Sequence, residues 1–208
     1  MTPQDLIQQY VNTGIGIPRY QFDRLPNDLK KSYIRKMYIS LDYKPYNIVY
    51  YYGELPEQKQ IEIVSHDGFL IEHINNPTEA AQLAAVTEDG LAIKHIKNPS
   101  EQVQITAVKK DGIAIKYIDN PSEEVQLTAV KKDYHSLKHI IQKRIIPSEA
   151  VQLAAVKKFG PMIEYIYNPS ETVQLAAVKE NRFAIKYIIK KGIKPSDEVY
   201  KIFNQYDK

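Results

Sequence analysis

The sequence predicts an all-α fold: an α-solenoid of about six 22-residue helical-hairpin repeats with a divergent N-terminal helical cap. One observation is the recurrence of a unit, which reads PTEAAQLAAVTEDGLAIKHIKN from Pro77 and PSEQVQITAVKKDGIAIKYIDN from Pro99. A second is the helix start signal, Pro followed by Ser or Thr and Glu, that opens most units. Tandem units of this length bury their apolar faces against their neighbours, which is how a solenoid is stabilised.

The repeats align on the proline that opens each unit, which we number as position 1. Copies begin at Pro56, Pro77, Pro99, Pro121, Pro147 and Pro169, and a half copy begins at Pro195. The intervals are 21, 22, 22, 26, 22 and 26 residues. The four extra residues in two of the units equal about one helical turn, so we expect a longer second helix or link there.

Three regions follow from this alignment. Residues 1–55 lack the repeat and hold nine of the 16 tyrosines, and we expect them to form a helical cap because an open stack needs its end unit covered. We expect helices at residues 3–12 and 26–40 within this cap. Residues 56–194 form the repeat array, and residues 195–208 form a C-terminal capping half repeat.

The segment Asn-Pro-Ser-Glu predicts where the first helix of a unit starts. Asn98 is the expected N-cap, Pro99 the first helical residue, and Glu101 the acidic member of a capping box. The helix is expected to run to the lysines at residues 109–110, which suit the negative end of its dipole. We expect Gly112 to end it in a left-handed conformation.

A second, short α-helix is expected at residues 113–119, and neighbouring units must stabilise it because helices of about two turns are marginal alone. In the first helix, positions 5, 8 and 9 share one side, and positions 7 and 10 lie roughly opposite. Apolar residues on two sides indicate a helix packed between two neighbours. Positions 4 and 11 lie together on an edge that we expect to face water.

The unit resembles the short helical repeats grouped as DUF4116, whose copies follow the pattern VLxAVKxNGxALxYA. The matching residues are Val125, Leu127, Ala129, Val130 and Lys131 in one helix and Gly112, Ala114, Ile115 and Tyr117 in the other. The resemblance covers roughly residues 56–195. It implies a helical-hairpin repeat fold and a bacterial, phage or large-virus protein, and it implies little about activity.

Composition narrows the function classes. Hydrophobic residues make up 43% of the chain and charged residues 25%, a composition that suits a packed domain. The net charge of +3 neither demands nor excludes nucleic acid as a partner. The chain has no cysteine, so disulfides and thiolate metal sites are excluded. The first ten residues lack the apolar segment of a signal peptide, and no run approaches the roughly 18 apolar residues of a membrane span. We expect a cytoplasmic protein with no membrane partner.

A glutamine occupies position 6 of five units. These residues are Gln82, Gln104, Gln126, Gln152 and Gln174. We interpret them as a structural row that bonds to the backbone of the inter-repeat loops, because buried amides must be satisfied. The alternative is a row of amides that binds a ligand.

Two positions of the second helix are the candidate partner-binding surface. Position 19 carries His73, His95, Tyr117, His139, Tyr165 and Tyr187, and position 18 carries Lys94, Lys116, Lys138 and Lys186, with Glu72 and Glu164 interrupting the lysines. Stacking turns these positions into parallel aromatic and basic rows that could hold an acidic protein or a nucleic acid. The alternative is that the rings pack half-buried and the lysines only maintain solubility. Tyr50, Tyr51 and Tyr52 are a second candidate contact site, since tyrosine is enriched in interfaces.

No catalytic, cofactor-binding or metal-binding residue is expected. His135 and His139 have the spacing of a metal pair but lack the glutamate of an HExxH motif, and the glutamates at position 3 suit capping better than catalysis. We therefore predict a non-enzymatic helical-repeat scaffold that binds a protein partner, and, by analogy alone, an inhibitor of a host enzyme from a phage or mobile element. The alternative is a nucleic-acid-binding solenoid. A weaker alternative is an enzyme with a pocket in the N-terminal region.

Overall fold

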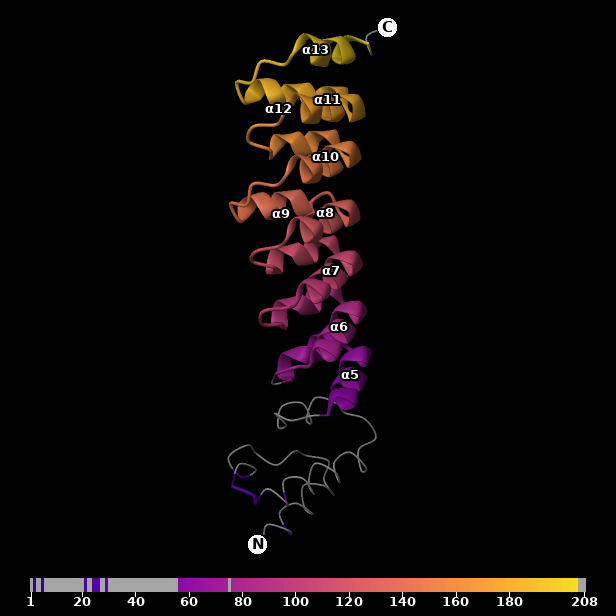
Figure 1. Cartoon of the computed structure of the whole chain (residues 1–208), viewed down its shortest axis with the longest axis vertical. Helices are drawn as coiled ribbons and strands as arrows, with labels where there is room; N and C mark the ends of the chain where they lie inside the picture. The colour runs from indigo at the N-terminus through magenta and orange to yellow at the C-terminus, as the bar shows by residue number, and fades with distance from the viewer. Residues whose placement is uncertain are drawn as a thin grey trace.

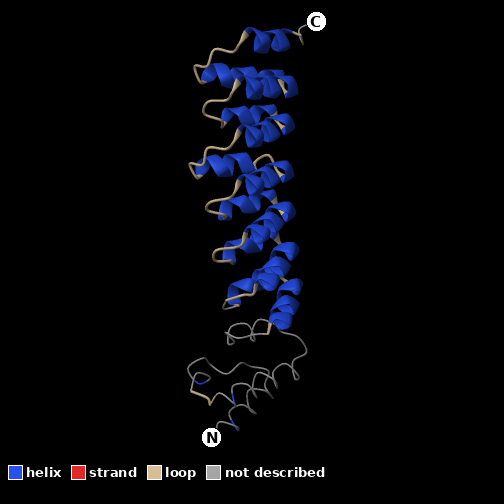
Figure 2. Cartoon of the chain, in the orientation of Figure 1, coloured by secondary structure: helices blue, strands red, loops and turns tan. Residues whose placement is uncertain are grey.

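The computed structural model describes residues 56–74 and 76–205, together with positions 2, 5, 21, 24–26 and 29. Apart from those isolated positions, the expected cap at residues 1–55, with Tyr50, Tyr51 and Tyr52, lies outside the described residues. The long helices stack in chain order, each packing on the next (Figure 1). The described residues contain helices and loops and no strand (Figure 2). The predicted all-α solenoid is therefore confirmed.

Each unit pairs a first α-helix with a second, shorter helix. The first helices are α5 (Glu57–His66), α6 (Glu79–Glu88), α7 (Glu101–Lys110), α8 (Glu123–Lys132), α10 (Glu149–Lys158) and α11 (Glu171–Glu180). The second helices are η1 (Gly68–His73), η2 (Gly90–His95), η3 (Gly112–Tyr117), α9 (Ser136–Gln142), η4 (Gly160–Glu164), and η5 (Arg182–Ala184) continued by α12 (Ile185–Lys190). A single helix, α13 (Asp197–Asn204), packs on α11.

The expected α-helical form of the second helix is wrong for the shorter units, where η1 to η4 are 3₁₀ helices. A 3₁₀ helix rises about 2.0 Å per residue against 1.5 Å for an α-helix, so a few residues span more of the neighbouring unit. In the two units with four extra residues, the second helix is α-helical at α9 and α12. The expectation was a longer second helix or link: α12 with η5 lengthens the helix, whereas α9 has seven residues against six in η1 to η3, so most of the extra residues there lie in the link.

The expected N-cap is also wrong, because the first helix starts two residues later. Ser122 caps α8, and its Oγ accepts the backbone N–H of Val125 at 3.3 Å. Serine or threonine does the same at the start of α6, α7, α10, α11 and α13. Asn98 instead adopts a left-handed conformation with φ of 50°, which asparagine tolerates better than most residues. It turns the chain ahead of the helix, so the following proline precedes the cap.

The glutamate that follows the cap therefore cannot form the expected capping box, since it occupies the first helical position. It bonds instead to the neighbouring unit: the Ser122 hydroxyl donates to the carboxylate of Glu101. The same bond joins Ser100 to Glu79, Ser148 to Glu123, and Ser170 to Glu149, each at 2.5 Å. Each serine thus caps its own helix and ties that helix to the preceding unit.

Gly112 does not end the first helix in a left-handed conformation, as was expected; the only described glycine with positive φ is Gly192. The helix ends because Asp111 becomes extended, and its carboxylate accepts the N–H of Ile113 at 2.9 Å. A Cβ on Gly112 would lie 2.8 Å from the carbonyl oxygen of Ala129 in the next unit. Glycine is required there by the close approach of two units.

The core runs through the stack without a break. Positions 5, 9 and 10 are fully buried in α6, α7, α8, α10 and α11, as at Val125, Ala129 and Val130. The second helices add residues such as Ile115, which is also fully buried. Positions 4 and 11 are exposed in α7, α8, α10 and α11, as the periodicity predicts. Packing of the first helices therefore leaves side chains free along the edge formed by positions 4 and 11.

Candidate functional site

The glutamine row has the structural role that we predicted. In each of the five units the glutamine Nε2 donates to the carbonyl oxygen of the unit's own opening proline, at 2.9 to 3.0 Å. That proline lies in the link between units, so the amide fixes the link against the first helix. Gln126 and Gln174 are buried, and within the described part of the chain their Oε1 atoms have no hydrogen-bond partner.

The lysines of position 18 are exposed, and most of them lie over aromatic rings. The Nζ atoms of Lys116 and Lys186 lie 4.7 and 4.8 Å from the ring centroids of Tyr117 and Tyr187. Lys94 lies over Phe69 of the preceding unit at 4.7 Å, and Lys138 over Tyr165 of the following unit at 5.4 Å. Three lysines of position 18 thus make cation–π contacts with tyrosines of position 19, whereas the ring under Lys94 lies outside that row.

The rings of position 19 are partly buried. Tyr117 and Tyr165 are 39% and 36% exposed, and His95, His139 and Tyr187 are more covered. His95 Nδ1 lies 3.2 Å from the carboxylate of Glu72 in the preceding unit. The side chain of His73 lies outside the described residues.

The predictions about a metal site and about a membrane span concern side chains and helices of the whole chain, and the structure describes only part of it. There, no group of three or more His, Cys, Asp or Glu side chains could hold a metal ion. The ring of His135 contacts the carboxylate of Asp133 at 3.0 Å. No helix in the same part of the chain is long and apolar enough to cross a membrane.

A second basic row, which we did not single out from the sequence, lies at the C-terminal ends of the first helices. It consists of the exposed residues Lys109, Lys110, Lys131, Lys132, Lys157, Lys158 and Lys179. The recurring Val-Lys-Lys segment signalled this row, but these lysines also suit the helix dipole and a water-facing edge, and we assigned them no binding role. Near it, a hollow of about 540 Å³ lies between α10 and α11, lined by Leu153, Leu175 and Lys157 among others.

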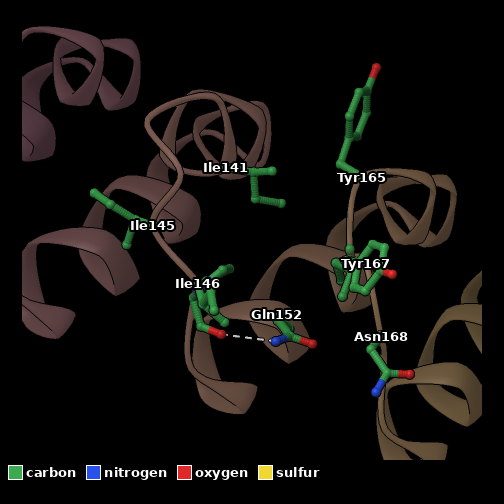
Figure 3. A pocket seen from close by; sticks show the side chains of 9 residues that line it. Ile141, Ile145, Ile146, Gln152, Tyr165, Tyr167 and Asn168 are labelled. Carbon is green, nitrogen blue, oxygen red and sulfur yellow. Dashed lines mark hydrogen bonds between the residues drawn. The ribbon is translucent and has the colours of Figure 1, made fainter.

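The most apolar candidate site is a pocket of about 370 Å³ between the α8–α9 unit and the next unit. Its wall comes from α9, from the link after α9, from α10 and from the link after η4 (Figure 3). The lining residues are Ile141, Ile145, Ile146, Pro147, Gln152, Tyr165, Ile166, Tyr167 and Asn168. Ile146 and Tyr167 are 91% and 92% exposed, so the rim presents large apolar side chains to solvent.

One polar group marks the floor of this pocket. Gln152 donates its Nε2 to the Pro147 carbonyl at 2.9 Å, and its Oε1 points away from that bond, toward the side on which Asn168 lies (Figure 3). That amide oxygen can accept a hydrogen bond.

Two lysines touch the lining. Lys138 lies over the Tyr165 ring, as described above. Lys191 Nζ donates to the carbonyl oxygen of Ile166 at 2.8 Å. Burial lowers the pKa of the Lys191 amine, and the nearby carboxylate of Glu164 opposes that shift. The apolar pocket thus has cations at its edge.

The corresponding place between the first two units has a different chemistry. A pocket of about 430 Å³ there is lined by Glu72, Asn76, Gln82, His95 and Lys97, with Ile71, Ile74 and Pro77. Lys97 and Tyr167 occupy the same position of the repeat. The fold therefore offers the same hollow more than once, and the residues at variable positions decide what it can bind.

Compared with protein-family models, with curated proteins and with solved structures, the chain shows no match. The candidate site is therefore defined by its own geometry: an apolar pocket at an inter-unit link, with Gln152 on its floor and Lys138 and Lys191 at its edge.

Proposed function

We propose that this chain is a non-enzymatic helical-repeat scaffold that binds a protein partner at the link edge of the solenoid. The observation that carries the proposal is the apolar pocket with Ile146 and Tyr167 on its rim, both more than nine-tenths exposed. Covering apolar surface contributes roughly 25 cal/mol per Å². Clustered apolar side chains on a surface mark interaction sites more often than isolated ones do.

The polar residues that recur in most units support the non-enzymatic part of this proposal. The glutamates that open the first helices bond to serine caps, as Glu123 does to Ser148. The glutamines bond to proline carbonyls, as Gln126 does to Pro121. These groups form hydrogen bonds that hold helices, links and units together. This structural role explains why they recur.

The resemblance to DUF4116 repeats supports a bacterial, phage or large-virus setting for this binding. Within that setting we propose that the partner is a host enzyme and that the chain inhibits it, an assignment that rests on analogy. A sequence without cysteine is compatible with a cytoplasmic partner.

Site-specific photocrosslinking in cells of the native host tests the proposal. A benzophenone amino acid replaces Tyr167 on the pocket rim in one variant and the exposed Gln102 on α7 in another. We expect a discrete protein adduct from position 167 and none of that mass from position 102. Equal adducts from both positions, or no protein adduct from position 167, would contradict the proposal.

Nucleic acid is the second candidate, and the two lysine rows favour it. Lys109 and Lys110 at the end of α7, for example, are followed one unit later by Lys131 and Lys132. Phosphate contacts make affinity fall steeply with salt, with a slope in log–log form of about −0.7 per contact for single strands. Titration of a labelled single strand at several salt concentrations separates the two candidates, because a protein partner held by the apolar pocket depends far less on salt.

A further inference from the structure

Resting on the proposed function, we propose that the pocket between α9 and η4 binds one aliphatic or aromatic side chain from an acidic peptide segment of the partner, with a carboxylate of that segment paired to Lys138. The proposal goes beyond a general protein-binding role because it states the chemistry of the bound segment.

The size of the pocket suits a single anchor. Its volume of about 370 Å³ lies at the lower end of the roughly 300–1,000 Å³ that small-molecule pockets have. Ile141, Ile166 and Tyr165 line it, and Gln152 is the polar group on its floor. Binding energy in interfaces is concentrated in large side chains that fill such pockets. The Gln152 Oε1 can accept a backbone N–H of the segment that carries the anchor.

The polar pocket between the first two units has a carboxylate at position 18, and the apolar pocket has a lysine at the same position. In the polar pocket, position 18 of the first unit is Glu72, and it pairs with His95 of the following unit at 3.2 Å. In the apolar pocket, position 18 is Lys138, and it faces Tyr165 of the following unit at 5.4 Å from the ring centroid. The ring attracts the ammonium but does not neutralise it. Lys138 therefore keeps its full charge at the surface, where a carboxylate of a bound segment can pair with it.

The other charges near the pocket are consistent with an acidic ligand. Lys191 contacts the Ile166 carbonyl and has Glu164 nearby. Glu149, on the first turn of α10, accepts the hydroxyl of Ser170, and the helix N-terminus offsets its charge. Lys138 is exposed, and so remains available to a carboxylate of the partner.

Substitutions that the repeat itself contains make matched test variants. Tyr167→Lys copies Lys97, which occupies the matched position at the polar pocket. Ile146→Lys copies Lys194, which precedes Pro195 in the corresponding link. Lys138→Glu copies Glu72, and Lys110→Glu, which copies Glu88 of the preceding unit, makes the same charge change at the exposed end of α7. Because each residue is present at a matched position of the fold, we expect wild-type melting temperatures.

The experiment is a selection of random twelve-residue displayed peptides on the full-length chain, with counter-selection on Tyr167→Lys. We expect enriched peptides to carry an aliphatic or aromatic residue flanked by Asp or Glu. The affinity of the best peptide should fall at least tenfold for Ile146→Lys and at least fivefold for Lys138→Glu. It should change less than twofold for Lys110→Glu.

Two outcomes overturn the inference: enrichment of basic or uncharged peptides, or no peptide that distinguishes wild type from Tyr167→Lys. The crosslinking experiment separates this failure from failure of the proposed function. A protein adduct at position 167 without acidic preference removes only the inference, whereas absence of the adduct removes the proposed function.

Discussion

At the scale of single residues, the same side chain performs the same task in successive units. Gln126 fixes the Pro121 carbonyl at 2.9 Å, and four other glutamines do so in their own units. Residues that depart from the repeat have other roles. Ser136 replaces a small apolar residue and donates its hydroxyl to the Gly112 carbonyl at 2.8 Å. Repetition thus indicates a structural role, and departure from it indicates where to look for a local adjustment or a site.

We expect Gln126→Ala to lower the free energy of unfolding by about 1–3 kcal/mol, because it leaves the Pro121 carbonyl without its partner. Urea denaturation measures the loss, with the exposed Gln102→Ala as the control. Binding should be unaffected. A variant that lost binding at wild-type melting temperature would show that the glutamine row is functional.

Arg144 offers a stabilising substitution. It has φ of 62° at the end of the α9 segment, where the matched residue of the other long unit is Gly192 with φ of 73°. The left-handed conformation costs a residue with a side chain roughly 1–2 kcal/mol, partly offset by the greater chain entropy of glycine. We expect Arg144→Gly to raise the free energy of unfolding by about 0.5–1 kcal/mol. Thermal denaturation checks this, and a lower melting temperature would contradict it.

At the scale of elements, the caps and the spacing between units decide where helices begin and how closely they pack. The serine cap satisfies its own helix and also bonds to the glutamate of the preceding unit, as Ser122 does to Glu101. Gly112 allows the carbonyl of Ala129 to approach closely. Where a helix begins and how closely it packs therefore depend partly on residues of the neighbouring unit.

The double role of the cap gives a prediction. Ser122→Ala should lower the free energy of unfolding by about 1 kcal/mol through loss of the cap. Ser122→Thr should stay close to wild type, because Thr78 caps α6 in the same way. A double-mutant cycle with Glu101→Ala should show coupling between the two residues; strictly additive losses would mean that the inter-unit bond contributes nothing.

Gly112→Ala tests the close approach of units. We expect a loss of about 1–3 kcal/mol, as for overpacking, since the new Cβ would meet the Ala129 carbonyl oxygen at 2.8 Å. Lys110→Ala on the neighbouring exposed surface is the control. Equal melting temperatures for wild type and Gly112→Ala would show that the units can separate without cost.

At the scale of the whole molecule, stacking converts positions of the repeat into rows and repeated hollows. One basic row follows the second helices, and another follows the ends of the first helices. The two hollows at the inter-unit links lie near the first row, and variable residues make one polar and the other apolar. The hollow between α10 and α11 lies near the second row. Function is expected on the edge that carries both the links and the two hollows beside them.

A comparison of the two rows tests this expectation. We expect a variant with Glu in place of Lys94, Lys116 and Lys138 to fold normally, since all three lysines are exposed. Its affinity for the crosslinked partner should fall at least tenfold. The same change at Lys109, Lys131 and Lys157 should weaken it less than threefold. Equilibrium binding of the purified partner at two salt concentrations measures both. Equal losses would indicate nonspecific charge, and a loss from the second set alone would place the site on the other edge.

Much of the fold could be predicted from local patterns. The 22-residue period and the apolar spacing specify stacked helices, because a unit with such a face must bury it against a neighbour. The identity of the N-cap could not be predicted from the segment alone, since Asn98 and Ser100 are both good caps. The left-handed turn at Asn98 decides between them, and that turn depends on how the units pack.

The sequence by itself determined the fold class, the register of the repeat, the buried positions of the first helix and the structural role of the glutamines, because each follows from periodicity or from the need to satisfy a buried amide. Only the tertiary structure decided the 3₁₀ form of the short second helices and the apolar pocket. Ile141, Gln152 and Tyr167 belong to three different segments. They meet only when one unit stacks on the next, and no local pattern encodes the distance between segments.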